Sequence, residues 1–268
     1  MKKKYIKSLL TFMLFAFAFS ALLYVNAGAE CSINISNVAK GYVTVKYTDG
    51  SKERIKVQVV KGDENYTYDI TGMSSTKIPL QMGKGKYSVY ILENISGTKY
   101  RPLTSETFDV PAVSNKDLYT ISIPMINFDA SKTAIKDISD ILKKKANDES
   151  KAKSLYNKLV QEWVYDFEKL KNDEPNYVPV IDTLYKSKKG ICYDYSSVIA
   201  GGLRKSGVPT RLVMGYASYV DVYHAWNEIL INGKWIIVDA TADSQYYKAK
   251  QSYKFAKNAK EFKVVKIF

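Results

Sequence analysis

The stretch that decides the fold is GICYDYSSVIAGGLRKSGVP, residues 190–209. Gly190 permits a sharp turn of the backbone, and the apolar and small residues after it are typical of a buried helix. Gly207, followed by Val208-Pro209, is a signal that ends a helix. The stretch therefore predicts a buried helix with Cys192 at its N-terminus.

The predicted position of Cys192 has chemical consequences. Unpaired backbone N–H groups at a helix N-terminus favour a negative thiolate, which is the nucleophilic form of cysteine. The same groups can hold an oxyanion. A free cysteine also packs well in an apolar core, so the position alone leaves a reactive thiol and an inert one equally open.

Downstream, Asn232-Gly233 is the strongest two-residue signal for a β-hairpin turn. It lies between two runs rich in strand-forming residues, 224–231 and 235–241, and a preceding strand is expected over 210–216. A two-residue turn fixes the pairing register of the strands that it joins. Leu230 is therefore predicted to lie opposite Trp235.

Counting outward from this turn places the sole histidine of the chain beside a carboxylate. Trp226 should lie opposite Asp239, and His224 opposite Thr241. Because side chains alternate between the faces of a sheet, His224 and Asp239 should share one face as diagonal neighbours. The hairpin thus predicts a hydrogen bond between an imidazole and a carboxylate.

Cys192, His224 and Asp239 together predict a catalytic triad. The histidine can take the thiol proton and later protonate a leaving amine, while the aspartate orients the ring and stabilises its charged form. Acyl transfer through a thioester is the reaction class that this combination indicates.

The first half of the chain has a different pattern. Alternating apolar and polar residues at 43–48 and 55–59 flank Asp49-Gly50, which predicts a hairpin. Further short runs with turn residues between them continue to Val110. About seven such strands predict a small immunoglobulin-like β-sandwich over residues 30–110. Without a ligand-specific motif, a spacer is favoured over a binding module.

Residues 111–128 are predicted to be a linker. After it, the spacing of the apolar residues becomes typical of helices, and a second domain is expected over 129–268. One helix is expected from Ser131 to Lys145, with Ser131 as its cap. A second should open at Asn147 and continue to near Leu170, with an apolar stripe that includes Trp163.

The N-terminus is predicted to be an export signal. Residues 1–29 combine a lysine-rich start, an apolar run and the small residues Ala27-Gly28-Ala29, which is typical of a secretory signal peptide cleaved after Ala29. The alternative is an uncleaved anchor, and only then is a membrane partner expected. The protein is predicted to be secreted or displayed at the cell surface.

The net charge of the chain indicates which classes of binding partner to expect. The chain carries +13, and residues 1–29 hold four lysines and no acid, so +9 remains after cleavage. This favours anionic partners such as cell-wall polymers, and export excludes nucleic acid. The lysines are dispersed, so a basic surface that is only solvated, with no specific partner, is an equally open interpretation.

A disulfide between Cys31 and Cys192 is disfavoured because Cys192 lies in the context of a reactive thiol.

Three blocks of sequence resemble the transglutaminase-like superfamily. They are GICYDYS (190–196) with GVPTR (207–211), HAWNE (224–228), and WIIVDAT (235–241). The resemblance covers about residues 129–268. It implies an α+β, papain-like fold in which the helix that bears the cysteine packs on an antiparallel sheet, and a preceding β-sandwich is also compatible with exported members.

The resemblance implies a thiol acyltransferase that acts on protein or peptide amides by cross-linking, deamidation or hydrolysis. A cysteine peptidase, or a surface-binding protein with a relic triad, is the alternative. It also implies an oxyanion donor, for which Tyr165 and Trp163 are candidates, and a shield over the His–Asp pair, for which Trp226 is the candidate. For both tryptophans, core packing is the other interpretation. No metal or cofactor is expected.

Overall fold

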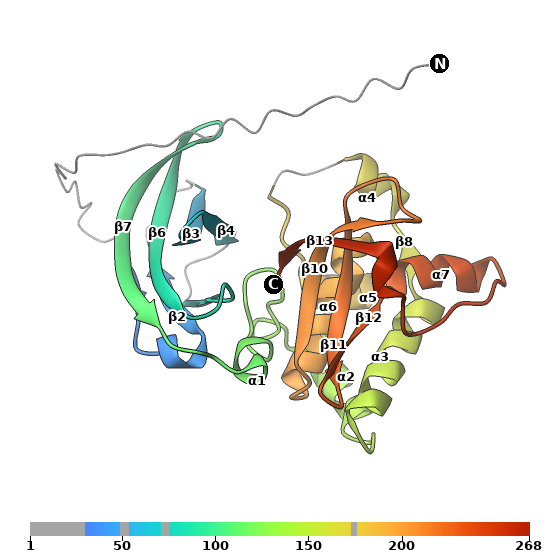
Figure 1. Ribbon diagram of the computed structural model, residues 1–268. Helices are drawn as coiled ribbons and strands as arrows, with labels where there is room; N and C mark the ends of the chain where they lie inside the picture. The colour runs from blue at the N-terminus through green and yellow to red at the C-terminus, as the bar shows by residue number, and fades with distance from the viewer. Residues whose placement is uncertain (1–29, 49–53, 71–74, 173–175) are drawn as a thin grey trace.

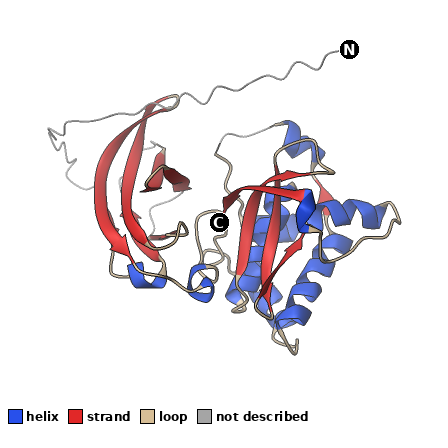
Figure 2. Ribbon diagram, viewed as in Figure 1, coloured by secondary structure: helices blue, strands red, loops and turns tan. Residues whose placement is uncertain are grey.

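The computed structural model describes residues 30–48, 54–70, 75–172 and 176–268 (Figure 1). Strands dominate the first part of the chain, and helices packed on a second set of strands form the rest (Figure 2). The predicted signal peptide, 1–29, and the predicted turn at Asp49-Gly50 lie outside the described residues. In the described ranges, no helix combines the length and apolar character needed to cross a membrane.

The first part consists of two antiparallel sheets, of three and four strands. In order across each sheet, they are β1 (Cys31–Asn34), β2 (Tyr42–Tyr47) and β5 (Thr76–Pro79), and β4 (Glu64–Ile70), β3 (Ile55–Lys61), β6 (Gly85–Ser96) and β7 (Lys99–Val110). A short 3-10 turn, η1 (Val38–Lys40), precedes β2. Alternate side chains such as Val43, Val57 and Val89 are fully buried. The observed strands agree with the expected small β domain, while its immunoglobulin-like character stays a prediction.

The hairpin predicted around Asp49-Gly50 is wrong. β2 pairs with β1 and β5, whereas β3 pairs with β4 and β6. The two alternating runs therefore belong to different sheets. Both strands bury one face, and an alternating pattern reports only that burial, which is the same whether two strands pair or lie in separate sheets.

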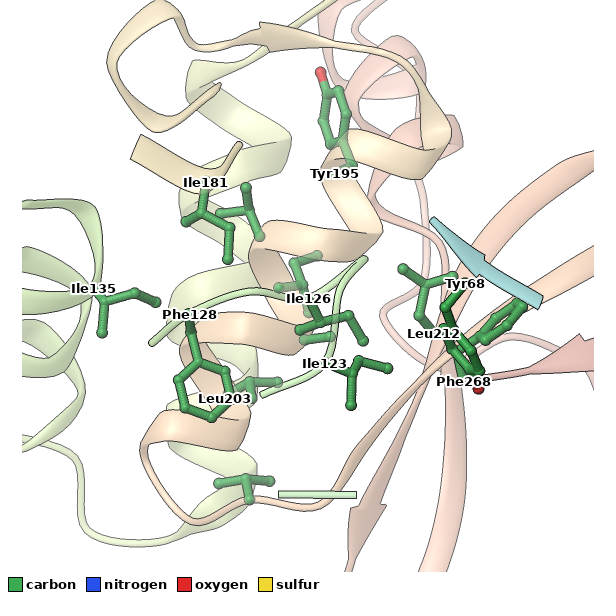
Figure 3. Close-up of a cluster of buried hydrophobic side chains, with 14 of the residues drawn as sticks. Tyr68, Ile123, Ile126, Phe128, Ile135, Ile181, Tyr195, Leu203, Leu212 and Phe268 are labelled. Carbon is green, nitrogen blue, oxygen red and sulfur yellow. The ribbon is translucent and has the colours of Figure 1, made fainter. Parts of the chain in front are cut away.

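The predicted linker, residues 111–128, is more structured than an exposed spacer. It contains the short helix α1 (Asn115–Leu118), whose N-terminus is capped by Ser114. Ile123, Ile126 and Phe128 are buried in the core, next to α6 (Figure 3). Burial of these apolar side chains stabilises the segment against the helices.

The second part is an α+β arrangement. The antiparallel sheet has the order β12 (Lys234–Val238), β11 (His224–Ile231), β10 (Thr210–Ala217) and β13 (Phe262–Ile267). The helices of this part are α2 (Thr133–Leu142), α3 (Asp148–Glu162), α4 (Phe167–Lys171), α5 (Ile181–Ser187), α6 (Cys192–Lys205) and α7 (Ala240–Lys248). Two short strands, β8 (Val164–Tyr165) and β9 (Lys189–Gly190), pair in parallel. The 3-10 turn η2 (Ala259–Glu261) precedes β13. The helix that begins at Cys192 packs on the sheet, as the sequence predicts.

Two helix boundaries differ from the expected ones. Asp182 of α5, not Ser131, caps α2, because its carboxylate accepts hydrogen bonds from the N–H groups of Lys132 and Ala134 at 2.9 and 2.8 Å. The helix expected to reach Leu170 ends at Glu162, since the next residues pair with β9.

A pair of glycines allows α6 to lie at the centre of the helical layer. A Cβ atom at Gly201 would stand 2.6 Å from Ile181 Cδ1, and one at Gly202 would stand 2.7 Å from Ile138 Cγ2 and 2.8 Å from Leu155 Cδ2. The side chains of α2, α3 and α5 therefore occupy the space that larger residues would need. Figure 3 shows Ile181, Ile135 and Leu203 in this cluster.

We predict that Gly202→Ala destabilises the protein by a net ~1 kcal/mol, because a clash with two branched side chains costs ~1–3 kcal/mol and exceeds the gain of ~1 kcal/mol in helix propensity. Urea unfolding measures the change. Gly201→Ala is the matched control: the same propensity gain applies, but only Ile181 stands in the way, so its cost should be smaller. Equal or greater loss in Gly201→Ala would contradict the packing argument.

Candidate functional site

Cys192 is the first residue of α6, and a buried carboxylate holds that end of the helix. Asp194 is fully buried and accepts hydrogen bonds from the Ile191 N–H at 2.8 Å, Lys169 Nζ at 2.6 Å and the Tyr177 hydroxyl at 2.8 Å. Asp194 thus complements the N-terminus of the helix instead of facing a substrate.

Glycine is required at position 190 because the backbone there passes very close to the side chain of Asp194. A Cβ atom there would lie 2.6 Å from the Cβ of Asp194. Glycine therefore lets the chain pass directly over the capping carboxylate just before the nucleophile. The sharp turn expected at Gly190 follows from this contact.

His224 and Asp239 are hydrogen-bonded, with 2.7 Å between Nε2 and Oδ2. Both side chains are buried. The same Oδ2 accepts from the Tyr219 hydroxyl at 2.9 Å, and Oδ1 accepts from the Ala242 N–H at 3.0 Å. Donors from β11, from the turn after β10 and from α7 therefore hold the carboxylate, and the carboxylate orients the imidazole ring.

Cys192 and His224 line the same pocket. Because Nε2 is engaged by Asp239, the nitrogen left for the thiol is Nδ1. Burial lowers the pKa of His224, but the hydrogen bond to Asp239 and the proximity of the Cys192 sulfur outweigh burial and raise the pKa from 6.5 to about 10. Burial raises the pKa of Asp239. The hydrogen bond and the charge of His224, together with the bonds from Ala242 and Tyr219, outweigh burial and leave this pKa below its usual value.

The hairpin register agrees with the sequence prediction from Ile231↔Lys234 to Asn227↔Val238. Beyond Val238 the prediction is wrong: β12 ends, and Asp239 becomes the N-cap of α7. Thr241 lies in that helix and not opposite His224. The His–Asp contact survives because Asp239 directly follows the last paired residue and still turns toward the end of β11.

A pocket of about 440 Å³ opens over Cys192 and His224. Its wall consists of aromatic, aliphatic and small polar side chains, and apart from His224 and Cys192 it holds no titratable group other than tyrosine. The remaining lining residues are Tyr165, Leu170, Tyr219, Val220, Val222, Tyr223, Thr241, Ala242, Gln245, Tyr246 and Ala249. The pocket suits an uncharged segment of a substrate.

The three candidate supporting residues lie in different environments. Tyr165 lines the pocket, and burial, followed by the proximity of Cys192, raises its pKa, so it is a hydroxyl donor. Trp163 is fully buried and packs edge-on against Tyr195, with 5.1 Å between ring centroids. Trp226 is buried beside His224, at 6.3 Å and 28° between the rings. The geometry leaves Tyr165 at the pocket and Trp163 in the core, and the roles of all three stay predictions.

Sequence reasoning missed Tyr219 and the support of α7. Tyr219 lies in the turn after β10, and no local pattern marks it as a partner of Asp239. Asp243, one helical turn after Asp239, is buried and accepts hydrogen bonds from the Tyr156 hydroxyl and Lys257 Nζ. Its spacing of four residues from Asp239, on the same face of a helix, was the available signal.

Both cysteines are free, and no disulfide joins them. Within the described ranges, no group of three or more histidine, cysteine, aspartate or glutamate side chains could hold a metal ion. The chemistry available at the pocket is that of a thiol, an imidazole and a carboxylate, with a tyrosine hydroxyl beside them.

The family model of the transglutaminase-like superfamily matches residues 136–240. This range includes Cys192, His224 and Asp239, and it agrees with the sheet and helices that surround them. The chain therefore contains, at residues 136–240, a domain of the transglutaminase-like superfamily.

Solved structures with a similar arrangement include a protein from Cytophaga hutchinsonii that is provisionally classed as a cysteine protease. It is 12% identical over 85% of this chain and 79% of the other, with a TM-score of 0.46. The periplasmic domain of TgpA from Pseudomonas aeruginosa is 13% identical over 85% and 98%, with a TM-score of 0.40. LapG from Legionella pneumophila is 17% identical over 51% and 70%, also with 0.40. No curated protein matches the chain. At these values the likeness carries no conclusion about activity.

We predict that the imidazole resonances of His224, the sole histidine, titrate with a pKa of about 10, as measured by NMR on protein without a histidine tag. Asp239→Asn should lower this pKa, because a neutral amide no longer stabilises the imidazolium. Since the folded state favours the charged ring, its contribution to the free energy of unfolding is complete below pH 6.5 and is lost as the pH rises to about 10. A pKa near 6.5 in the parent protein would contradict the described geometry.

Proposed function

We propose that the protein is a thiol acyltransferase that acts on protein or peptide amides through a thioester at Cys192. One observation carries the proposal: Cys192 begins a helix and shares a pocket with His224, while Nε2 of that imidazole bonds the buried Asp239. The observation supports a nucleophile, a base and an orienting carboxylate in one chain of contacts.

In the acylation step, His224 holds the proton of the Cys192 thiol and the sulfur attacks the amide carbonyl. The C=O π electrons move to oxygen, and we assign the stabilisation of that oxyanion to N–H groups at the start of α6 and to the Tyr165 hydroxyl. Collapse breaks the C–N bond as His224 gives its proton to the leaving amine. The product is a thioester on Cys192.

The thioester then reacts with an acceptor, and His224 takes the acceptor's proton. A primary amine gives a new amide, whereas water gives a free acid by deamidation or peptide hydrolysis. The acylation step is common to both outcomes, so a transglutaminase and a cysteine peptidase require the same triad. Residues 1–29, with their basic, apolar and small-residue pattern, support an extracytoplasmic location for this reaction.

We predict rapid alkylation of Cys192 by iodoacetamide well below pH 8, in protein whose Cys31 is replaced by serine. An imidazolium beside the sulfur stabilises the thiolate, so His224→Ala should restore the pH profile of an ordinary thiol. The measurement is the second-order rate against pH, with Cys192→Ala as the blank. A slow rate that rises only near pH 8.5 in the parent protein would overturn the proposed function.

Tyr165 provides a second test. We predict that Tyr165→Phe lowers kcat by roughly 10²-fold, as loss of one oxyanion donor does elsewhere, with little change in Tm. Trp163→Phe is the matched control, since that ring is buried in the core: it should lower Tm and leave kcat nearly unchanged. Steady-state kinetics on an amide substrate and thermal unfolding measure both. If Tyr165→Phe retains full kcat, the hydroxyl does not stabilise the transition state.

A further inference from the structure

The chain between α7 and β13 is unusually basic. Residues 248–263, here called the lysine segment, contain six lysines and a single acidic residue, Glu261. Lys257 turns inward to Asp243. The other five lysines are exposed, and none forms an ion pair with any carboxylate in the described part of the chain; they are Lys248, Lys250, Lys254, Lys260 and Lys263.

Lysines on three other helices form local ion pairs. On α2, α3 and α4, lysines pair with acids three or four residues away, as in Lys136–Asp140, Lys153–Glu149, Lys158–Glu162 and Lys171–Glu168. Such local pairs compensate the charge of those surfaces. The lysine segment lacks this compensation, so its positive field extends into solvent and favours an anionic partner.

The lysine segment adjoins the active-site pocket at both ends. At its start, α7 supplies Gln245 and Tyr246 to the pocket wall, and the C-cap residue Ala249 follows them there. At its far end the chain continues into Phe262, whose ring packs against Tyr219 at 5.8 Å between centroids. Figure 1 shows the chain leaving the end of α7 and returning to β13. Because Ala249 lines the pocket, its neighbours Lys248 and Lys250 lie at the edge of the pocket.

The backbone at Lys250 adds a second observation. Its φ is +55°, a left-handed conformation directly after the C-cap of α7, where glycine is the least strained choice. A cationic side chain is thus held at a position that the fold alone would give to glycine. Strain of this kind points to a role for the side chain outside the fold.

We infer that the lysine segment is a docking surface for an acidic stretch of the polypeptide substrate. The reactive amide lies in an uncharged stretch, because the pocket lining carries no charged side chain apart from the catalytic pair, and the acidic residues follow it along the same chain. One extended polypeptide can span both regions, since they share α7. The inference rests on the proposed function and adds the substrate class to it.

The test is a binding measurement on the full chain with Cys192→Ala, so that no turnover intervenes. The probes are two fluorescein-labelled peptides with the same uncharged, aromatic-containing sequence, one followed by four glutamates and the other by four glutamines. At low salt the glutamate peptide should bind ~10-fold more tightly, and added NaCl should remove the difference. Equal affinities for the two peptides would overturn the inference.

Matched lysine variants locate the effect. Lys250→Gln combined with Lys254→Gln should remove most of the preference for the glutamate peptide. Lys144→Gln combined with Lys145→Gln makes the same change in net charge on the exposed loop after α2 and should keep the preference. If both double variants lose it equally, only net charge acts and the docking surface is disproved.

Lys250→Gly separates docking from folding. Relief of the left-handed strain should raise Tm, while loss of the charge should weaken binding of the glutamate peptide. A variant with lower Tm and unchanged binding would overturn the assignment of Lys250. Binding of the lysine segment to phosphatidylglycerol vesicles or to a wall polyanion, with no preference between the peptides, would overturn the assignment to a polypeptide.

Failure of docking and failure of the proposed function are distinguishable. Peptide binding is measured in the Cys192→Ala protein and does not depend on the thiol, whereas the alkylation profile of Cys192 does not depend on the lysines. An ordinary thiol profile with an intact peptide preference would refute the reaction and keep the docking surface. The reverse combination would keep the reaction and refute the docking surface.

Discussion

The carboxylate of Asp239 joins the fold of the second domain to its chemistry. One oxygen accepts the N–H of Ala242 and starts α7, while the other holds His224 and Tyr219. A fully buried charge is costly unless hydrogen-bond donors surround it. Here the donors belong to His224, Tyr219 and Ala242, which also line the pocket. The orientation of the imidazole, the start of α7 and the pocket wall therefore depend on a single ionised group.

The nucleophile is held by a second buried carboxylate with a different task. Asp194 binds the backbone before Cys192 and the side chains of Lys169 and Tyr177, and the glycine at 190 gives it room. Behind it, Gly201 and Gly202 let the surrounding helices close on α6. This close packing holds α6 against its neighbours and with it the backbone of Cys192.

Patterns with a local cause were predictable from the sequence, and those with a tertiary cause were not. Asn232-Gly233 fixes its register by turn geometry alone, and the five pairs that follow agree with it. The sequence predicts that the strand continues through Asp239, whereas β12 ends at Val238 and Asp239 caps α7. Aspartate is a strong helix N-cap, which is the local signal for this end. The break after Glu162 depends on pairing with β9, and the separation of β2 from β3 depends on which sheet each strand joins. No pattern within those segments reports either contact.

The strand β13 gives the first domain a route to the site. Its first residue, Phe262, packs against Tyr219 and Trp226, and Ile267 near its end donates its N–H to the Tyr66 hydroxyl of β4 at 3.3 Å. Phe268 then packs edge-on against Tyr66, and its carbonyl is held by the buried Arg204 of α6. A strand of this length spans ~20 Å. Strand β4 of the first domain is thus attached to the same strand that supports the partner of Asp239, so packing and a hydrogen bond at the end of β13 join the two parts of the chain, in addition to residues 111–128.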